Sequence, residues 1–151
     1  MKYLVMVQGS QADYDAMKGE ASPQSPAWSE QDLRAMFAYM NSINDDLAES
    51  GEWIDGQGLV EPSRTRFVTA DSEGRPVVQD GPYDPAQAVL AGYWVLECTS
   101  LDRVTEIAAR VAQCPQPPGA PEYPVVIRPI DESGGSDLGP ATDTAADTGS
   151  G

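Results

Sequence analysis

Hydrophobic residues occur along this chain in two distinct patterns. Residues 2–8 and 91–98 carry apolar side chains at both odd and even positions, which indicates strands that are covered on both faces. Residues 29–51 instead carry apolar side chains three or four positions apart, which predicts a helix with one dry face. The apolar stripe of this helix consists of Leu33, Met36, Phe37, Met40, Ile43 and Leu47.

Two helices with recognisable ends are expected. Ser29 is a suitable N-cap for the first helix, which has Glu30 in its first turn and Gly51 after its last apolar position. The second helix follows a cap at Thr99 or Ser100. Its apolar side consists of Leu101, Val104, Ile107, Ala108 and Val111.

Turn signals mark shorter strands between the two helices. Residues 53–60 predict a strand interrupted by Gly56 and Gly58, which indicates a bulge or a close backbone approach. Residues 66–70 and 75–79, separated by a polar turn, are typical of a hairpin.

Two irregular segments complete the chain's organisation. Residues 9–28 form a connection longer than most loops in compact domains, with a short helix expected over residues 12–18. Connections of this length commonly serve as lids or flaps, so this segment is a functional candidate. Residues 114–124 hold five prolines and lead into a last strand at residues 125–127.

The order of these elements predicts an α+β fold. Strand, helix, strand, hairpin, strand, helix and strand together form the ferredoxin-like βαββαβ pattern of two split β-α-β units. Right-handed crossovers place both helices on the same face of the antiparallel sheet. The opposite face stays bare, although three strands are apolar on both sides, and so large an exposed patch is unfavourable in water. We therefore expect a homodimer formed through the sheet faces.

Charge restricts the partners that this chain can bind directly. The net charge is −15, from 24 acidic and 9 basic residues, which disfavours direct binding to nucleic acid and to anionic membranes. Residues 131–151 are acidic and nearly free of large apolar groups, so we expect a disordered tail after a single domain at residues 1–130. Met1 and Lys2 lead directly into a strand and no apolar run approaches 18 residues, so we expect a cytoplasmic protein.

The turn at Asp80, Gly81, Pro82 and Tyr83 is the most distinctive candidate site. In a structural interpretation, Asp80 accepts local backbone hydrogen bonds and Gly81 adopts an unusual dihedral angle. In a functional interpretation, the carboxylate and the phenol lie at the mouth of a cleft and act on a ligand. The sequence leaves both interpretations open.

Scarce basic residues and one aromatic residue extend the candidate site. Arg64, Arg66 and Arg128 either pair with surface carboxylates or capture an acidic ligand. Tyr93 and Trp94 point to opposite faces of one strand, so one is expected under the helices and the other at the dimer interface or in a pocket.

Cofactor and metal chemistry is not indicated. The chain has no histidine, and its two cysteines, Cys98 and Cys114, lack metal-binding spacing and a basic neighbour that would activate a thiolate. The glycines form neither a phosphate-binding loop nor a dinucleotide fingerprint. We therefore expect no cofactor and no metal.

Four ordered segments resemble the YCII-related family of the DGPF type. Residues 80–83 followed by residues 90–93 resemble its DGPF…GGY/F pattern, with Tyr83 in place of the usual Phe. Residues 56–59 resemble its Gly-x-Gly-Leu segment, and residues 126–130 resemble its closing strand. Residues 101–112 resemble its second helix, and the whole resemblance spans about residues 1–130.

The resemblance implies a ferredoxin-like fold of the dimeric α+β barrel type and, for many members, an association with extracytoplasmic-function sigma factors. Residues 84–88 lack the acidic and basic run that usually follows DGPF, so no role transfers to them. Other branches use a His-Asp pair, which this histidine-free chain cannot form.

Three functions therefore remain open from the sequence. The first is an accessory or ligand-sensing dimer in a sigma-factor-linked setting, with a small molecule and a sigma factor or other regulatory protein as partners. The second is a cofactor-independent enzyme that acts on a small organic substrate near Asp80 and Tyr83. The third is an interaction protein whose partner binds the acidic surface.

Overall fold

The protein contains a four-stranded antiparallel sheet with the strand order β2-β5-β1-β6. The computed structural model describes residues 1–81 and 83–133. The strands of the sheet are β1 (Lys2–Gly9), β2 (Trp53–Gly58), β5 (Val89–Glu97) and β6 (Val126–Pro129).

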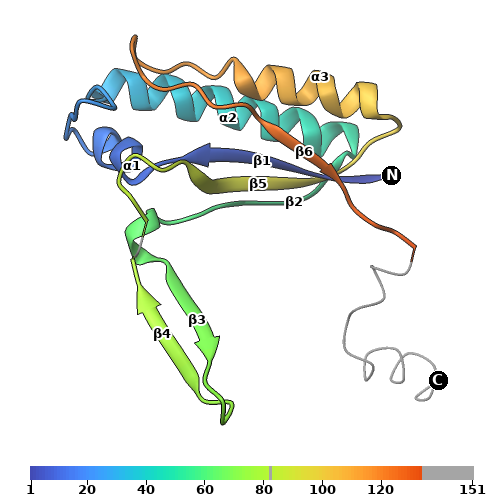
Figure 1. The fold of residues 1–151 in the computed structure, drawn as a ribbon. Helices are drawn as coiled ribbons and strands as arrows, with labels where there is room; N and C mark the ends of the chain where they lie inside the picture. The colour runs from blue at the N-terminus through green and yellow to red at the C-terminus, as the bar shows by residue number, and fades with distance from the viewer. Residues whose placement is uncertain (82, 134–151) are drawn as a thin grey trace.

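Two long helices cover one face of this sheet. Figure 1 shows α2 (Glu30–Ser50) and α3 (Leu101–Ala112) side by side above the strands, with α1 (Gln11–Met17) at one end of the sheet. A separate hairpin of β3 (Arg66–Ala70) and β4 (Pro76–Asp80) projects away on the side opposite α2 and α3 (Figure 1). A single 3₁₀ turn, η1 (Pro62–Arg64), precedes the hairpin. The α+β class and the antiparallel sheet are therefore confirmed.

Local signals placed the helices correctly. Ser29 caps α2 through a reciprocal capping box with Asp32, and Gly51 ends the helix with a φ angle of 80°. Ser100 caps α3 by accepting a hydrogen bond from the backbone of Arg103. The short helix expected over residues 12–18 is α1, which ends one residue earlier.

The core lies between the helices and one face of the sheet. Cross-strand pairs Tyr3–Leu96 and Val5–Trp94 bury their side chains on this face. The residues of the helices that complete the core are Ile43 and Leu47 of α2 and Val104, Ile107, Ala108 and Val111 of α3. Trp94 is thus the core member of the Tyr93–Trp94 pair, and its indole Nε1 donates a hydrogen bond of 2.9 Å to Asn44.

The opposite face of the sheet, here called the open face, has an apolar centre flanked by the polar residues Asp55, Gln57 and Arg128. Leu4 lies opposite Val95, and Met6 lies opposite both Tyr93 and Val126. All five side chains are only partly buried, because neither α2 nor α3 lies on this side (Figure 1). The sequence pattern of strands apolar on both faces is therefore present in the sheet, with one face uncovered in the protomer.

The expected strand boundaries needed small corrections. The strand predicted at residues 53–60 ends at Gly58, and its pairing with β5 shifts between Trp53 and Asp55. Of the two predicted alternatives, a bulge or a close backbone approach, the irregular pairing beside Gly56 matches the bulge. A Cβ atom at Gly56 would lie 2.4 Å from the ring of Trp53, so an indole side chain approaches this glycine closely. Pro82 and residues 134–151, most of the expected tail, lie outside the described residues.

A bidentate ion pair joins the end of α2 to the start of α3. Nε and Nη2 of Arg103 each donate a 2.8 Å hydrogen bond to the Glu52 carboxylate, whose side chain is only 14% exposed. These hydrogen bonds lower the pKa of Glu52 to about 2 from its usual 4.5.

Glu52→Gln should therefore destabilise the fold in a pH-dependent manner. Because the folded-state pKa is depressed, the stabilisation is complete above pH 4.5 and is lost as the pH falls towards 2. We expect a loss of about 1–2 kcal/mol in the free energy of unfolding at pH 7, measured in urea. A difference between variant and wild type that is equally large at pH 7 and pH 2.5 would contradict this assignment.

Candidate ligand-binding site

The first two turns of α2 contribute no fully buried residue to the core. Of the predicted apolar stripe, Ile43 and Leu47 are buried, whereas Met36 is only partly buried and Phe37 is 55% exposed. The apolar face of the helix therefore continues beyond the packed core, and it borders a cavity of about 410 Å³, here called the inner cavity.

The walls of the inner cavity come from both layers of the fold. The sheet contributes the end of β1, the end of β2 and Ala91 of β5. The remaining walls are helix α1, Trp28 with the first turns of α2, and the proline-rich segment 114–124. Aromatic and aliphatic side chains dominate these walls, and no Lys or Arg lines them among the described residues. The aromatic and acidic lining residues are Asp13, Tyr14, Trp28, Phe37 and Tyr123.

Asp13 is the charged group of this cavity. Its carboxylate accepts hydrogen bonds from the Ser25 hydroxyl at 2.5 Å, the Tyr123 hydroxyl at 2.7 Å and the Ser10 backbone N–H at 2.9 Å. Burial by itself would raise the pKa of Asp13, but these hydrogen bonds outweigh it and lower the pKa below its usual value. The carboxylate is thus held in its charged form by neutral donors.

The Asp13 network also fixes the cavity walls relative to one another. Ser10 and Asp13 form the capping box of α1, Ser25 is 2% exposed in the following loop, and Tyr123 belongs to the proline-rich segment. Burial and the Asp13 carboxylate raise the pKa of Tyr123. Its hydroxyl therefore stays protonated and donates a hydrogen bond to Asp13. One carboxylate therefore connects three segments that are distant in sequence.

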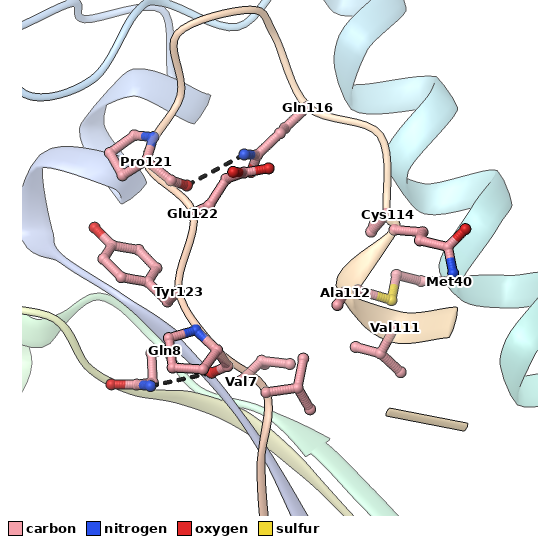
Figure 2. Close-up of a pocket in the computed structure, with 13 residues that line it drawn as sticks. Val7, Gln8, Met40, Val111, Ala112, Cys114, Gln116, Pro121, Glu122 and Tyr123 are labelled. Atoms are coloured by element: carbon pink, nitrogen blue, oxygen red, sulfur yellow. Dashed lines mark hydrogen bonds between the residues drawn. The ribbon is translucent and has the colours of Figure 1, made fainter. Parts of the chain in front are cut away.

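A second cavity of about 490 Å³, here called the loop cavity, adjoins the inner cavity. The two share Val7, Gln8, Gln116, Pro121 and Tyr123 as lining residues. Figure 2 shows Gln116 and Glu122 on one side of the loop and the ring of Tyr123 turned to the other. The Gln116 side-chain amide donates a hydrogen bond of 3.2 Å to the Pro121 carbonyl within the loop. The Gln8 side-chain amide donates one of 3.2 Å to the Pro124 carbonyl, which joins the loop to β1.

The structure places most residues of the DGPF-like turn at the base of the hairpin. Nε of Arg66 lies 3.0 Å from a carboxylate oxygen of Asp80, and both side chains are about two-thirds exposed. Gly81 has a φ angle of 57°, and its N–H donates to the carbonyl of Thr65. The ring of Tyr83 packs edge-to-face on Phe67 at a centroid distance of 5.2 Å.

The other predicted site residues lie elsewhere. Tyr93 is half-buried on the open face, and Arg128 is exposed on β6 opposite Leu4. Tyr83 borders a third cavity of about 390 Å³ with Leu59 and Leu90, but Asp80 does not line it. The structure thus brings Arg66, Asp80, Gly81 and Tyr83 together and separates them from Tyr93 and Arg128.

The inner cavity was not predicted from the sequence. Its segment 9–28 was marked as a functional candidate, but Asp13, Ser25 and Tyr123 were not. The Ser10-x-x-Asp13 spacing of a capping box was a readable signal. The partners of Asp13 were not readable, because Ser25 and Tyr123 lie 12 and 110 positions away.

The described residues offer little for metal or thiol chemistry. Between residues 1 and 133, apart from Pro82, no three His, Cys, Asp or Glu side chains are grouped so that they could hold a metal ion. Burial raises the pKa of Cys98 to about 11 and also raises that of Cys114, so neither thiol is activated. No helix in this part of the chain is long and apolar enough to span a bilayer.

Comparison with known proteins identifies the family. An uncharacterized protein of Rhizobium meliloti (strain 1021) is 24% identical over 104 residues, which cover 69% of this chain and 80% of that protein. The model of the YCII-related domain matches residues 1–126, which include every strand and helix of the fold up to the start of β6. The chain therefore belongs to the YCII-related family.

Proposed function

We propose that this protein is a homodimeric ligand-sensing protein that binds a small organic molecule in the inner cavity. The observation that carries the proposal is a cavity of about 410 Å³ bounded by apolar and aromatic side chains and a hydrogen-bonded carboxylate. Small-molecule sites commonly have volumes of about 300–1,000 Å³ and combine apolar walls with a few oriented polar groups.

The polar groups of the cavity favour a neutral or cationic ligand. The Tyr14 hydroxyl donates a hydrogen bond to the Leu59 carbonyl, and the Tyr123 hydroxyl donates one to Asp13. The oxygen atoms of both hydroxyls can therefore only accept hydrogen bonds from a ligand. The Asp13 carboxylate accepts and carries a negative charge. With a net charge of −15 on the chain and no basic group in these described walls, an anionic ligand would be repelled.

The homodimer and the finer fold assignment belong to the same proposal. In the sheet, β5 lies between β1 and β2, and β1 lies between β5 and β6, which supports two interleaved β-α-β units of the ferredoxin-like type. The apolar open face supports association of two sheets face to face in a dimeric α+β barrel. Stable interfaces bury about 800 Å² per partner, so the proposed dimer requires a contact of that order across the open face.

The regulatory setting rests on the family resemblance. A sigma factor or another regulatory protein remains our expected partner, and we expect the complex to form in the cytoplasm. The enzymatic alternative near Asp80 and Tyr83 stays a prediction. The exposed Arg66–Asp80 pair and the turn at Gly81 favour a structural role for that segment over a dry catalytic site.

Two fluorescent probes of similar shape test the proposed site. N-phenyl-1-naphthylamine is neutral, and 1-anilinonaphthalene-8-sulfonate carries one negative charge on the same ring system. We expect the neutral probe to bind at least about tenfold more tightly in a fluorescence titration, because Asp13 and the chain repel the sulfonate. Equal affinities would contradict the assigned ligand class.

Paired substitutions on α2 locate the probe. Met36→Glu places a charge in the cavity wall and should weaken binding of the neutral probe by at least about tenfold. Ala38→Glu adds the same charge to the exposed side of the same helix and should leave binding within about twofold of wild type. The inner cavity would be excluded as the site if both variants bound the probe like wild type.

Tyr123→Phe tests the Asp13 network. Removing the hydroxyl deprives Asp13 of one donor and should lower the free energy of unfolding by about 1–2 kcal/mol at pH 7. It should also raise the pKa of the Asp13 carboxyl, measured by NMR titration of its side-chain carbon. An unchanged Asp13 titration would show that Tyr123 does not hold the carboxylate in solution.

A further inference from the structure

Among the described residues, the rest of the chain supports the hairpin of β3 and β4 at its base, where Tyr83 packs on Phe67, and leaves its strands exposed. All ten strand residues are exposed, and the two strands pair only with each other. Two-stranded hairpins are at best marginally stable in water without a surface to pack against. A hairpin that is ordered in this way therefore needs a covering surface.

One face of this hairpin is apolar. The cross-strand pairs Val68–Val78 and Ala70–Pro76 lie on the same face, beyond the Arg66–Asp80 ion pair at the base. Val68 and Val78 are 60% and 47% exposed. The other face carries the polar residues Thr69 and Gln79 opposite Val77 and Phe67. The Val68 face is thus the one suited to a dry contact.

The position of the hairpin identifies its partner surface. It extends on the side of the sheet opposite α2 and α3, which is the side of the open face (Figure 1). A second copy seated on the open face would therefore lie within reach of the hairpin. Leu59 and Leu90, which line a cavity together with Tyr83, are 40% and 42% exposed. These two side chains extend the apolar surface from the base of the hairpin towards the sheet.

Charge also favours a second copy as the partner. Residues 64–80 contain three arginines (64, 66 and 75) and three acidic residues (71, 73 and 80), so this segment has no net charge in a chain of −15. Two acidic copies repel each other wherever their charged surfaces meet, but a neutral apolar arm can contact an acidic partner without that cost.

We propose that the β3–β4 hairpin is a dimerisation arm whose Val68 face packs on a second copy of this chain. The inference rests on the proposed homodimer and adds the element that secures it. Each arm reaches across the interface, so that the open faces form its centre and the two arms flank them.

Sedimentation equilibrium of matched full-length variants tests the arm. Val68→Lys and Val78→Lys each place a charge on the apolar face and should raise the dimer dissociation constant at least about tenfold. Thr69→Lys adds the same charge on the opposite face and should change it less than about twofold. All three positions are exposed in the protomer, so thermal unfolding should show intact folds.

Amide hydrogen exchange provides a second readout. The hairpin amides should be protected in the wild-type dimer and should exchange much faster in Met6→Lys, which disrupts the open face without touching the arm. The arm is overturned, and the homodimer is not, if the wild type is a dimer but Val68→Lys and Val78→Lys leave its dissociation constant unchanged and Met6→Lys leaves the hairpin amides protected. A wild-type chain that is monomeric at micromolar concentration overturns both, whereas ligand binding is tested separately by the probes.

Discussion

A mismatch between the sheet and its helix layer determines most features of this structure. The central strands of the sheet are apolar on both faces, but α2 and α3 lie on only one of them. Even on that face, the fully buried core residues of α2, Ile43 and Leu47, are confined to its second half. The uncovered sheet face is the open face. The inner cavity lies where the first turns of α2 extend beyond the core, beside Met36 and Phe37.

The open face and the inner cavity differ in shape and therefore suit different binding partners. The apolar side chains of the open face are Leu4, Met6, Tyr93, Val95 and Val126, and a patch of this kind suits contact with another protein surface. The inner cavity is small and concave, and its walls are held together by Asp13, so it suits a small molecule. Because Val7 of β1 lines the cavity while its neighbour Met6 faces the other way, the same strand contributes to both surfaces. The proposed dimer contact and the proposed ligand site therefore share one strand.

The sequence predicted the parts of this structure that depend on short-range signals. The helix caps at Ser29 and Ser100, the hairpin and the irregular pairing near Gly56 follow from residues within a few positions of one another, although β4 begins and ends one residue later than predicted. The distribution of apolar residues also predicted apolar side chains on both faces of the sheet, which the structure contains. It did not show that the stripe of α2 would extend past the core, because periodicity records which face is apolar and not what packs against it.

The candidate site could not be predicted to the same extent. Asp13 gains its role from Ser25 and Tyr123, which no local pattern connects to it. The DGPF-like turn was prominent because its residue types are unusual, and in the structure Gly81 supplies the positive φ angle that such a turn requires. A prominent motif therefore marked a structural feature here, while the charged group of the cavity lay in an ordinary capping box.

Oxidative footprinting of Met6 tests most directly the claim that a second copy covers the open face. Met6 lies on the open face and Met36 lies on the helix side, and both are partly buried in the protomer, so Met36 serves as the internal reference. We predict that, relative to Met36, the oxidation rate of Met6 measured by mass spectrometry falls as the chain is concentrated from nanomolar to micromolar. A ratio of the two rates that stays constant over this range would contradict the account.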